Sequence, residues 1–160
     1  MGQGEKVMKA AAIASSFEMS LRILQMLNIL RDTPLSGEQI GAIDFIAVYA
    51  ADFDLLDENL HGYNPYRYSE YPARRALVSD AIKGLALDGY VALRSMRDGY
   101  RFQITQAGAA ACNNISNSYA TEYEIAIREV ARGFNIHDLG QLKSAINEKT
   151  LESLKGNGHE

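Results

Sequence analysis

A single hairpin signal constrains the fold more than any other feature of this sequence. Residues 90–96 and 100–105 are two short runs in which apolar and polar side chains alternate, and Asp98-Gly99 lies between them. Such alternation is typical of strands with one buried face, and Asp-Gly is a strong signal for a hairpin turn. The longer segments on both sides carry the apolar spacing of helices. We therefore expect a mostly α fold with a small β-hairpin.

Three segments before the hairpin have helical patterns. Residues 15–32 carry apolar side chains around more than half of the helix circumference, so we expect other elements to cover this helix on two sides. Ser36 and Gln39 form a capping-box pattern for a second helix that runs to about Tyr49. A third helix is predicted over residues 72–88.

The order helix, helix, helix, hairpin is that of a winged helix-turn-helix. In that fold the third helix is the usual recognition helix and the hairpin is the wing, which in this chain carries Arg94, Arg97 and Arg101. We predict a winged helix-turn-helix core followed by C-terminal helices. Residues 1–135 are expected to form a single winged-helix-like domain, and residues 136–160 a C-terminal helical extension with a frayed tail.

The third predicted helix has two distinct faces. Its apolar arc consists of Leu77, Val78, Ala81, Ile82 and Leu85. On the opposite side Arg75, Ser79 and Lys83 are candidate contacts to a partner protein or to DNA, with Asp80 beside them. Arg74 falls inside the apolar arc. It either extends its guanidinium outward or meets a carboxylate such as Glu70 or Asp44.

Residues 60–75, LHGYNPYRYSEYPARR, hold four of the nine tyrosines and lead into the third predicted helix. Gly62 and Pro65 shape a turn, Ser69 is a candidate N-cap and Pro72 fits the first helical turn. The candidate contact residues in this stretch are His61, Tyr63, Tyr66, Arg67 and Tyr68. Tyrosine and arginine are favoured at protein interfaces, but tyrosines before a helix are as often ordinary packing. Both interpretations stay open for these tyrosines, whereas packing is favoured for Tyr71.

The segment 117–134 carries a narrow apolar seam at helical spacing. The seam consists of Tyr119, Tyr123, Ala126, Ile127, Val130 and Phe134. It either packs on the first helix or joins two copies of the chain, so residues 119–134 are a candidate homodimer interface. A further helix is expected to begin at Asn135.

The net charge of −4 is distributed unevenly along the chain. Residues 61–105 carry seven basic and four acidic side chains, whereas both flanking regions are acidic. An acidic protein is a poor general binder of polyanions, but a local basic face can still contact phosphate. Segment 61–105 is therefore a candidate for DNA contact.

The sequence lacks the residues that several classes of function need. No phosphate-cradling glycine loop is present, and the acids of residues 52–58 lack the glycine and glutamate of an EF-hand. General acid or base work by His61 and the tyrosines would need a positioned partner, and no such arrangement is readable. We expect no catalytic, cofactor-binding or metal-binding residues, and no enzyme. Cys112 is the only cysteine, which favours a reducing cytoplasm, and neither a leader nor a membrane-spanning window is found, so we expect a soluble cytoplasmic protein.

The sequence also resembles a known family. The resemblance spans roughly residues 20–125 and rests on the segments RILQMLNIL, PLSGEQIGAIDFIAVYAADF, NLHGYNPYRYSEYPARRALVSDAIKGLALDGYV and YRFQITQAGAA. Its more distinctive parts are PLS, the DF pair in the second predicted helix, LHG, and RYSE followed by RR. These segments are similar to the middle component of bacterial ABC-three-component systems, relatives of Lamassu-type phage defence.

The resemblance implies a small winged-helix-like subunit that is encoded between an SMC-like or ABC-type ATPase and an effector, and that bridges them. We therefore expect a non-catalytic adaptor of an anti-phage defence complex, with the ATPase and the effector as its partners. The alternative is a winged-helix transcription regulator that binds DNA as a dimer through residues 72–88 and the wing. Against it, the third predicted helix presents just two cations on its outer side, whereas a recognition helix normally offers more donors.

Overall fold

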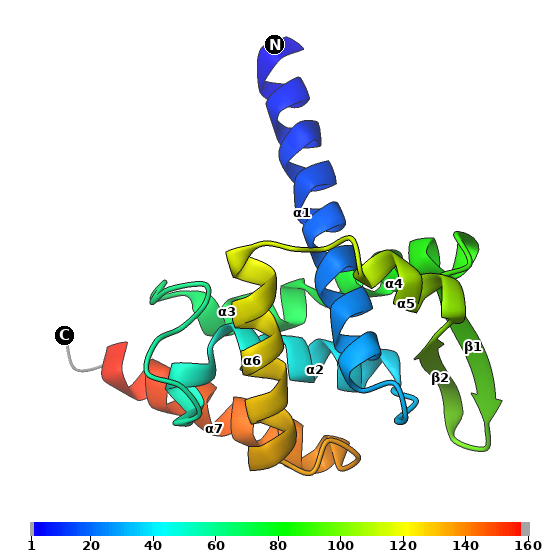
Figure 1. Ribbon diagram of the computed structural model, residues 1–160. Coiled ribbons are helices and arrows are strands. Elements are labelled where there is room, and N and C mark those ends of the chain that lie inside the picture. Colours follow the sequence, from blue (N-terminus) through cyan, green and yellow to red (C-terminus); the bar gives the residue numbers. More distant parts are fainter. Residues whose placement is uncertain (1, 158–160) are drawn as a thin grey trace.

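The computed structural model describes residues 2–157, with side chains from Ser16 to Gly156. Within this range the chain is mostly helical and contains a two-stranded antiparallel sheet (Figure 1). The helices are α1 (Gly2–Ile29), α2 (Gly37–Val48), α3 (Arg67–Ala73), α4 (Arg75–Leu87), α5 (Gln106–Cys112), α6 (Ser118–Gly133) and α7 (Leu139–Asn157), with a 3-10 helix η1 (Ala50–Phe53). The strands are β1 (Val91–Met96) and β2 (Gly99–Ile104). The expected mostly α fold with a small hairpin is confirmed.

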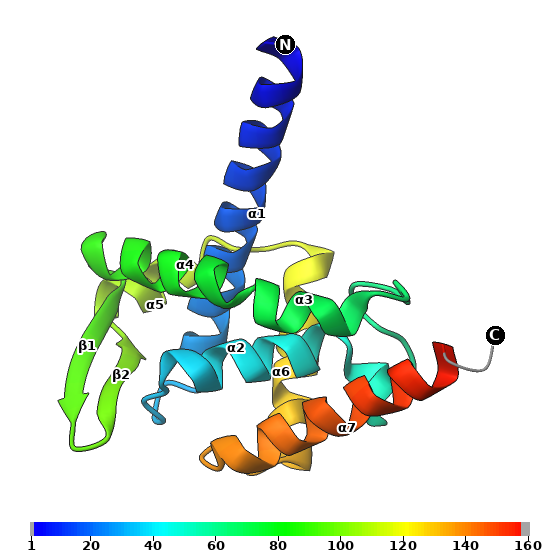
Figure 2. The ribbon, with the colours of Figure 1, turned by 180° about the vertical axis from the view of Figure 1, so that it is seen from behind.

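Helix α2 lies at the centre of the molecule. Every residue from Ala42 to Ala50 is buried, because α1, α4, α6 and α7 pack around this segment. Figure 2 shows the same molecule from behind, where α3 and α4 follow each other along one side of α2. The predicted capping box is confirmed: Ser36 Oγ accepts a hydrogen bond from the Gln39 N–H at 3.1 Å, and Gln39 Oε1 accepts one from the Ser36 N–H at 2.8 Å.

The hairpin is tied to the start of α2 by a short backbone bridge. Strands β1 and β2 pair from Val91 opposite Ile104 to Met96 opposite Gly99, so the predicted hairpin is confirmed. The expected buried face is wrong for β1, because Leu93 is 54% exposed and Val91 is the buried residue of this strand. Leu35 and Phe102 exchange two backbone hydrogen bonds, with N···O distances of 3.1 and 2.7 Å. This bridge places Phe102 beside the first turn of α2.

The predicted helix over residues 72–88 is wrong at its N-terminal end. The chain forms two helices there, α3 and α4, with Arg74 between them. Pro72 lies inside α3, where it has no N–H to donate and its ring disturbs the preceding turn, so the helix is interrupted shortly afterwards. Ser69 is not an N-cap, because its hydroxyl lies within α3 and donates to the Tyr66 carbonyl at 2.7 Å.

Other boundaries also differ from the prediction. Helix α1 extends back to Gly2, and α7 begins at Leu139 because the Asn135 and Asp138 side chains first hold a turn by accepting backbone hydrogen bonds. Helix α5 is missing from the sequence prediction; Thr105 Oγ1 caps its start by accepting from a backbone N–H at 3.1 Å. Helix α7 continues to Asn157, so only the end of the predicted frayed tail lies outside the described residues.

The apolar seam of α6 faces α1 and α2 of the same chain, and its central members Tyr123, Ile127 and Val130 are fully buried. Packing on the first helix, one of the two alternatives for this seam, is therefore confirmed. Helix α7 adds Leu142 and Ile146 to the same core. The domain boundary at residue 135 stays a prediction. Within residues 2–157, no helix combines the length and the apolar character that a membrane crossing needs.

Candidate partner-binding surfaces

A buried polar cluster joins α1, α2, α6 and the break between α3 and α4. It consists of Arg22, Asp44, Arg74 and Tyr123. Arg22 donates to both carboxylate oxygens of Asp44 at 2.9 and 3.2 Å, and the Tyr123 hydroxyl donates to the same carboxylate at 2.7 Å. Arg74 lies 3.5 Å from Asp44 and 3.0 Å from Glu70. Arg74 thus turns inward and meets both of the carboxylates expected for it.

Burial and charge act in opposite directions on Asp44. Burial alone would raise the pKa of its carboxyl group, but the charge and the hydrogen bonds of Arg22, together with the charge of Arg74, hold that pKa below its usual range. The side chain is only 1% exposed. Its charge is therefore used to hold helices together and is closed to a substrate or a partner.

Asp52, in η1, holds the tyrosine-rich stretch, which we define as residues 60–75. Its carboxylate accepts hydrogen bonds from Asn59 at 3.1 Å and from the Tyr68 hydroxyl at 2.8 Å, and it pairs with Arg67. Burial opposes the charge on Asp52, but these hydrogen bonds hold the pKa of its carboxyl group below the usual value. Two candidate contact residues, Arg67 and Tyr68, therefore bind Asp52 of the same chain. Tyr71 packs its ring against Phe45.

His61 forms a polar contact with Tyr119, at 2.7 Å between Nε2 and the hydroxyl oxygen. Burial and the nearby charges of Arg22 and Arg74 lower the pKa of His61 to about 4, so its ring is neutral at pH 7. The two side chains line a hollow of about 440 Å³ between α1 and the segment that leads into α6. We call it the α1–α6 hollow.

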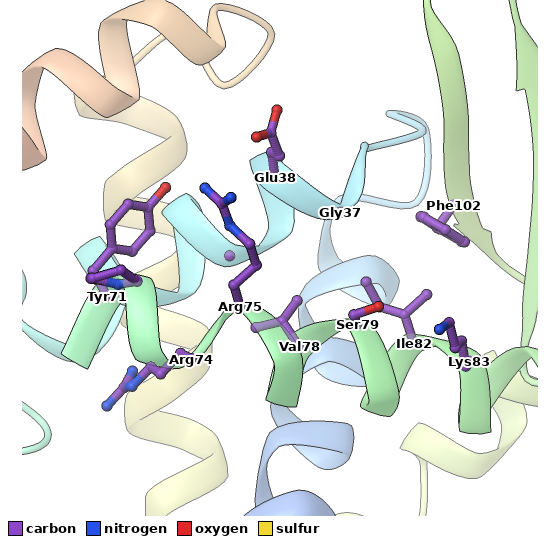
Figure 3. Close-up of a pocket in the computed structure, with 12 residues that line it drawn as sticks. Gly37, Glu38, Tyr71, Arg74, Arg75, Val78, Ser79, Ile82, Lys83 and Phe102 are labelled. Atoms are coloured by element: carbon purple, nitrogen blue, oxygen red, sulfur yellow. The ribbon is translucent and has the colours of Figure 1, made fainter.

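A groove of about 300 Å³ lies between α4 and the N-terminal half of α2. We call it the α2–α4 groove. Its apolar lining comes from Val78, Ile82 and Phe102, and the wall on α2 includes Gly37 and Gly41. Figure 3 shows side chains of α4, Val78 and Ile82 among them, extending toward α2 and its glycines.

Three predicted contact residues, Arg75, Ser79 and Lys83, meet in the α2–α4 groove. All three are exposed, and within the part of the chain that the structure describes neither Arg75 nor Lys83 takes part in an ion pair. Glu38 on the opposite wall pairs with Lys143 of α7 at 3.1 Å. The groove therefore combines an apolar floor with two cations that form no ion pair among residues 16–156.

A second hollow of about 520 Å³ continues the groove toward α7. It shares Tyr71, Pro72 and Arg75 with the α2–α4 groove, and Ile146 and Leu154 of α7 line its far side. Tyr66, which is 74% exposed, also borders this hollow. Tyr66 and Arg75, which both belong to residues 60–75, thus border the same hollow.

The remaining predicted contact residues do not gather into one site. Tyr63 is exposed on the loop before α3. On the hairpin, Arg94 lies opposite Arg101, which is held by the carboxylate of Asp98 at 2.7 Å, and Arg97 is exposed at the turn.

The sequence pattern of α4 does not reveal the groove residues that come from α2 and β2. Phe102 is predicted to lie on the buried face of the hairpin, but it is only half-buried and lines the α2–α4 groove. Gly37 and Gly41 are spaced by one helical turn, so they lie on one face of α2. That spacing is the signal for an open helix wall, but only the fold shows that α4 lies opposite it.

The geometry describes a small helical body with an apolar core, a buried polar cluster within it and several hollows on its surface. The model of one protein family, described as ABC-three component (ABC-3C) system Middle Component 2, matches residues 12–156. The chain belongs to this family. The match extends beyond the segments that carry the sequence resemblance and includes nearly all of α7, so this helix is part of the middle component 2 unit. Comparison with curated proteins and with solved structures gave no match.

Proposed function

We propose that this middle component 2 protein is a non-catalytic adaptor in a Lamassu-related anti-phage defence complex, where it bridges an SMC-like or ABC-type ATPase and an effector. Its family makes it one component of a multi-component system. An adaptor needs a stable body and at least two surfaces that different partners can occupy at the same time.

The observation that best supports bridging is that the α2–α4 groove and the α1–α6 hollow have separate linings. Residues of α2, α3, α4 and β2 line the α2–α4 groove, whereas α1, His61 and residues 115–120 line the α1–α6 hollow. The two sets have no residue in common. One partner at each hollow would therefore not compete directly for the same side chains.

The buried ionisable groups support a structural role over a catalytic one. The carboxylates of Asp44 and Asp52 are occupied by arginine, tyrosine and asparagine donors of the same chain. A general acid or base must reach the proton that it transfers. These carboxylates instead stabilise the packing of the elements around the α2–α4 groove and the α1–α6 hollow.

We also propose that α1, α2, α4 and the hairpin form a core of the winged-helix type. The order of these elements supports this, and so does the bridge between Leu35 and Phe102, which adds a third short extended segment to the hairpin. In this core α4 takes the position of the recognition helix.

Co-expression of the chain with the ATPase and the effector encoded beside it tests the adaptor function. The expected result is a single complex that contains all three proteins, and omission of the chain should separate the ATPase from the effector. A chain that remains monomeric beside both proteins, or an ATPase and effector that associate equally well without it, would overturn the proposal.

A winged-helix DNA-binding regulator is the second candidate function, and the exposed Arg94 and Arg97 on the hairpin favour it. Measuring the affinity for duplex DNA against salt concentration tests this candidate. Several phosphate contacts predict a log-log slope of about −0.9 per contact. A slope near zero would remove it.

A further inference from the structure

We propose that the α2–α4 groove binds an acidic amphipathic helix of a partner protein, with apolar side chains on the groove floor and carboxylates beside Arg75 and Lys83. This inference rests on the proposed adaptor function and names the chemistry of one partner. It assigns the groove to protein recognition and leaves the α1–α6 hollow for another contact.

The floor of the groove selects for apolar side chains. Val78 and Ile82 come from α4, and Phe102 closes the end of the groove near the hairpin. Helix α4 has 13 residues and therefore a length of about 20 Å, which matches three to four turns of a second helix. An amphipathic helix that lays its apolar stripe into such a groove is a common mode of peptide recognition.

The charges around the floor select for an acidic partner. Glu38 is already paired with Lys143, and Arg74 is turned toward Asp44 and Glu70. Arg75 and Lys83 are then the charged lining residues that have no ion-pair partner among residues 16–156. They are eight residues apart along α4, or about two turns, so carboxylates at matching spacing on a bound helix would meet both.

The glycines on α2 make room for a close approach. A Cβ atom built on Gly41 has no other atom within 4 Å, so this position opens directly into the groove. A Cβ at Gly41 therefore meets no atom of another element, and a larger side chain here would extend into the groove. This feature separates an effect on binding from an effect on folding.

Nucleic acid fits the groove less well than an acidic helix. DNA binding relies on several phosphate contacts from lysine and arginine, and the groove offers two available cations around an apolar floor. Glu38 also lines the groove. DNA is therefore the competing ligand, and crosslinking must distinguish it from a protein helix.

A photo-crosslinking amino acid placed at Ser79 identifies the occupant directly. The full chain is co-expressed with the neighbouring ATPase and effector, irradiated, and the crosslinked peptide is identified by mass spectrometry. The expected product joins residue 79 to a partner segment that alternates apolar and acidic residues at helical spacing. Crosslinks from position 79 to DNA, or no crosslink from it within an intact complex, would overturn the inference. A chain that forms no complex at all would remove the adaptor function and this inference together.

Two variant pairs measure what the groove contributes. Gly41→Leu should weaken partner binding roughly 10-fold or more because it fills the groove, while its thermal midpoint stays equal or rises. Gly84→Leu is the matched control, since Gly84 also lies in a helix and also has no atom within 4 Å of a built Cβ, but it lies outside the groove lining. Equal binding by the two glycine variants would contradict the inference.

The second pair changes charge. Arg75→Glu with Lys83→Glu should weaken binding roughly 10-fold or more at low salt, because both reversals place like charges against the partner's carboxylates. Arg128→Glu with Arg132→Glu makes the same change in net charge on the exposed side of α6 and should leave affinity within about 2-fold. Equal losses from both pairs would show that net charge, and not the groove, governs binding.

Discussion

The buried polar cluster and the α2–α4 groove both contain arginines, but they use them in opposite ways. In the buried polar cluster, Arg22 and Arg74 surround one carboxylate that is closed to solvent. In the groove, Arg75 and Lys83 stand at the surface beside apolar side chains. Adjacent residues of the chain, Arg74 and Arg75, therefore belong to different functions: one holds the fold and the other is available to a partner.

This difference shows why a perturbed pKa is a poor guide to the functional surface of this protein. The lowered pKa values of Asp44 and Asp52 arise from ion pairs and hydrogen bonds within the chain. Such networks perturb pKa values as strongly as active sites do. The surface that we propose for a partner is distinguished instead by two cations with no ion pair among residues 16–156 and by its apolar floor.

The largest effect is expected from breaking the buried polar cluster. Asp44→Ala leaves the guanidinium of Arg22 buried without its carboxylate, and the free energy of unfolding should fall by about 3 to 5 kcal/mol. Urea denaturation measures this loss. Asp98→Ala, which removes the exposed partner of Arg101, should change stability by no more than about 0.5 kcal/mol. Similar small losses from both variants would contradict the assignment of Asp44 to the folding scaffold.

Two of the four tyrosines in residues 60–75, Tyr66 and Tyr68, should respond differently to truncation. Tyr68 is 8% exposed and donates to Asp52, so Tyr68→Ala should cost about 3 kcal/mol of stability through the cavity and the lost hydrogen bond. Tyr66 is mostly exposed, so Tyr66→Ala should stay within about 0.5 kcal/mol. Denaturation curves and partner affinities for both variants separate packing from docking. A large stability loss from Tyr66→Ala would place that ring in the scaffold as well.

His61 should make the stability of the chain depend on pH. Its pKa lies near 4 in the folded chain and near 6.5 when unfolded, so the unfolded state binds the extra proton first as the pH falls. Stability should therefore be complete above about pH 6.5 and decline as the pH falls toward 4. His61→Gln should flatten this decline in urea denaturation at a series of pH values. The loss from protonating Asp44 occurs at lower pH, because its pKa is depressed below 3.8. An unchanged slope in His61→Gln between these pH values would show that folding does not lower the pKa of His61.

The smallest effect is a gain in stability. Gly41→Ala and Gly84→Ala replace glycines inside helices at positions where a Cβ meets no atom within 4 Å. Each should raise the free energy of unfolding by about 0.5 to 1 kcal/mol. Thermal or urea unfolding measures the gain. A loss at Gly41 would show that the groove wall is closed in solution.

The sequence predicts the local structure well where one segment contains all the interacting groups. The Ser36–Gln39 capping box and the hairpin depend on neighbours only a few residues apart, and both are confirmed. The turn itself lies at Arg97-Asp98, one residue before the predicted Asp98-Gly99. For Arg74 the sequence leaves two alternatives, an outward guanidinium or a carboxylate partner, and the structure shows the second.

Features that depend on distant segments were not predictable. Arg67 and Tyr68 look like free contact residues in the sequence, but Asp52 reaches them across a turn of the chain. The groove needs Gly41 from α2 and Phe102 from β2 to meet α4, and no single segment contains this information. The break at Arg74 results from Pro72 acting within a helix whose start, at Arg67, carries no side-chain cap that a sequence pattern could reveal.

Reconstitution with the Gly41→Leu variant is the sharpest test of our proposal that the chain holds two other components through separate surfaces. The neighbouring ATPase and effector are purified with either the wild-type chain or the variant, and the mass of each complex is measured by light scattering. We expect a three-component complex with the wild-type chain and a two-component complex with Gly41→Leu, in which one partner is lost and the other retained. A wild-type chain that elutes alone near 17.6 kDa, or a variant that loses both partners or neither, would contradict it.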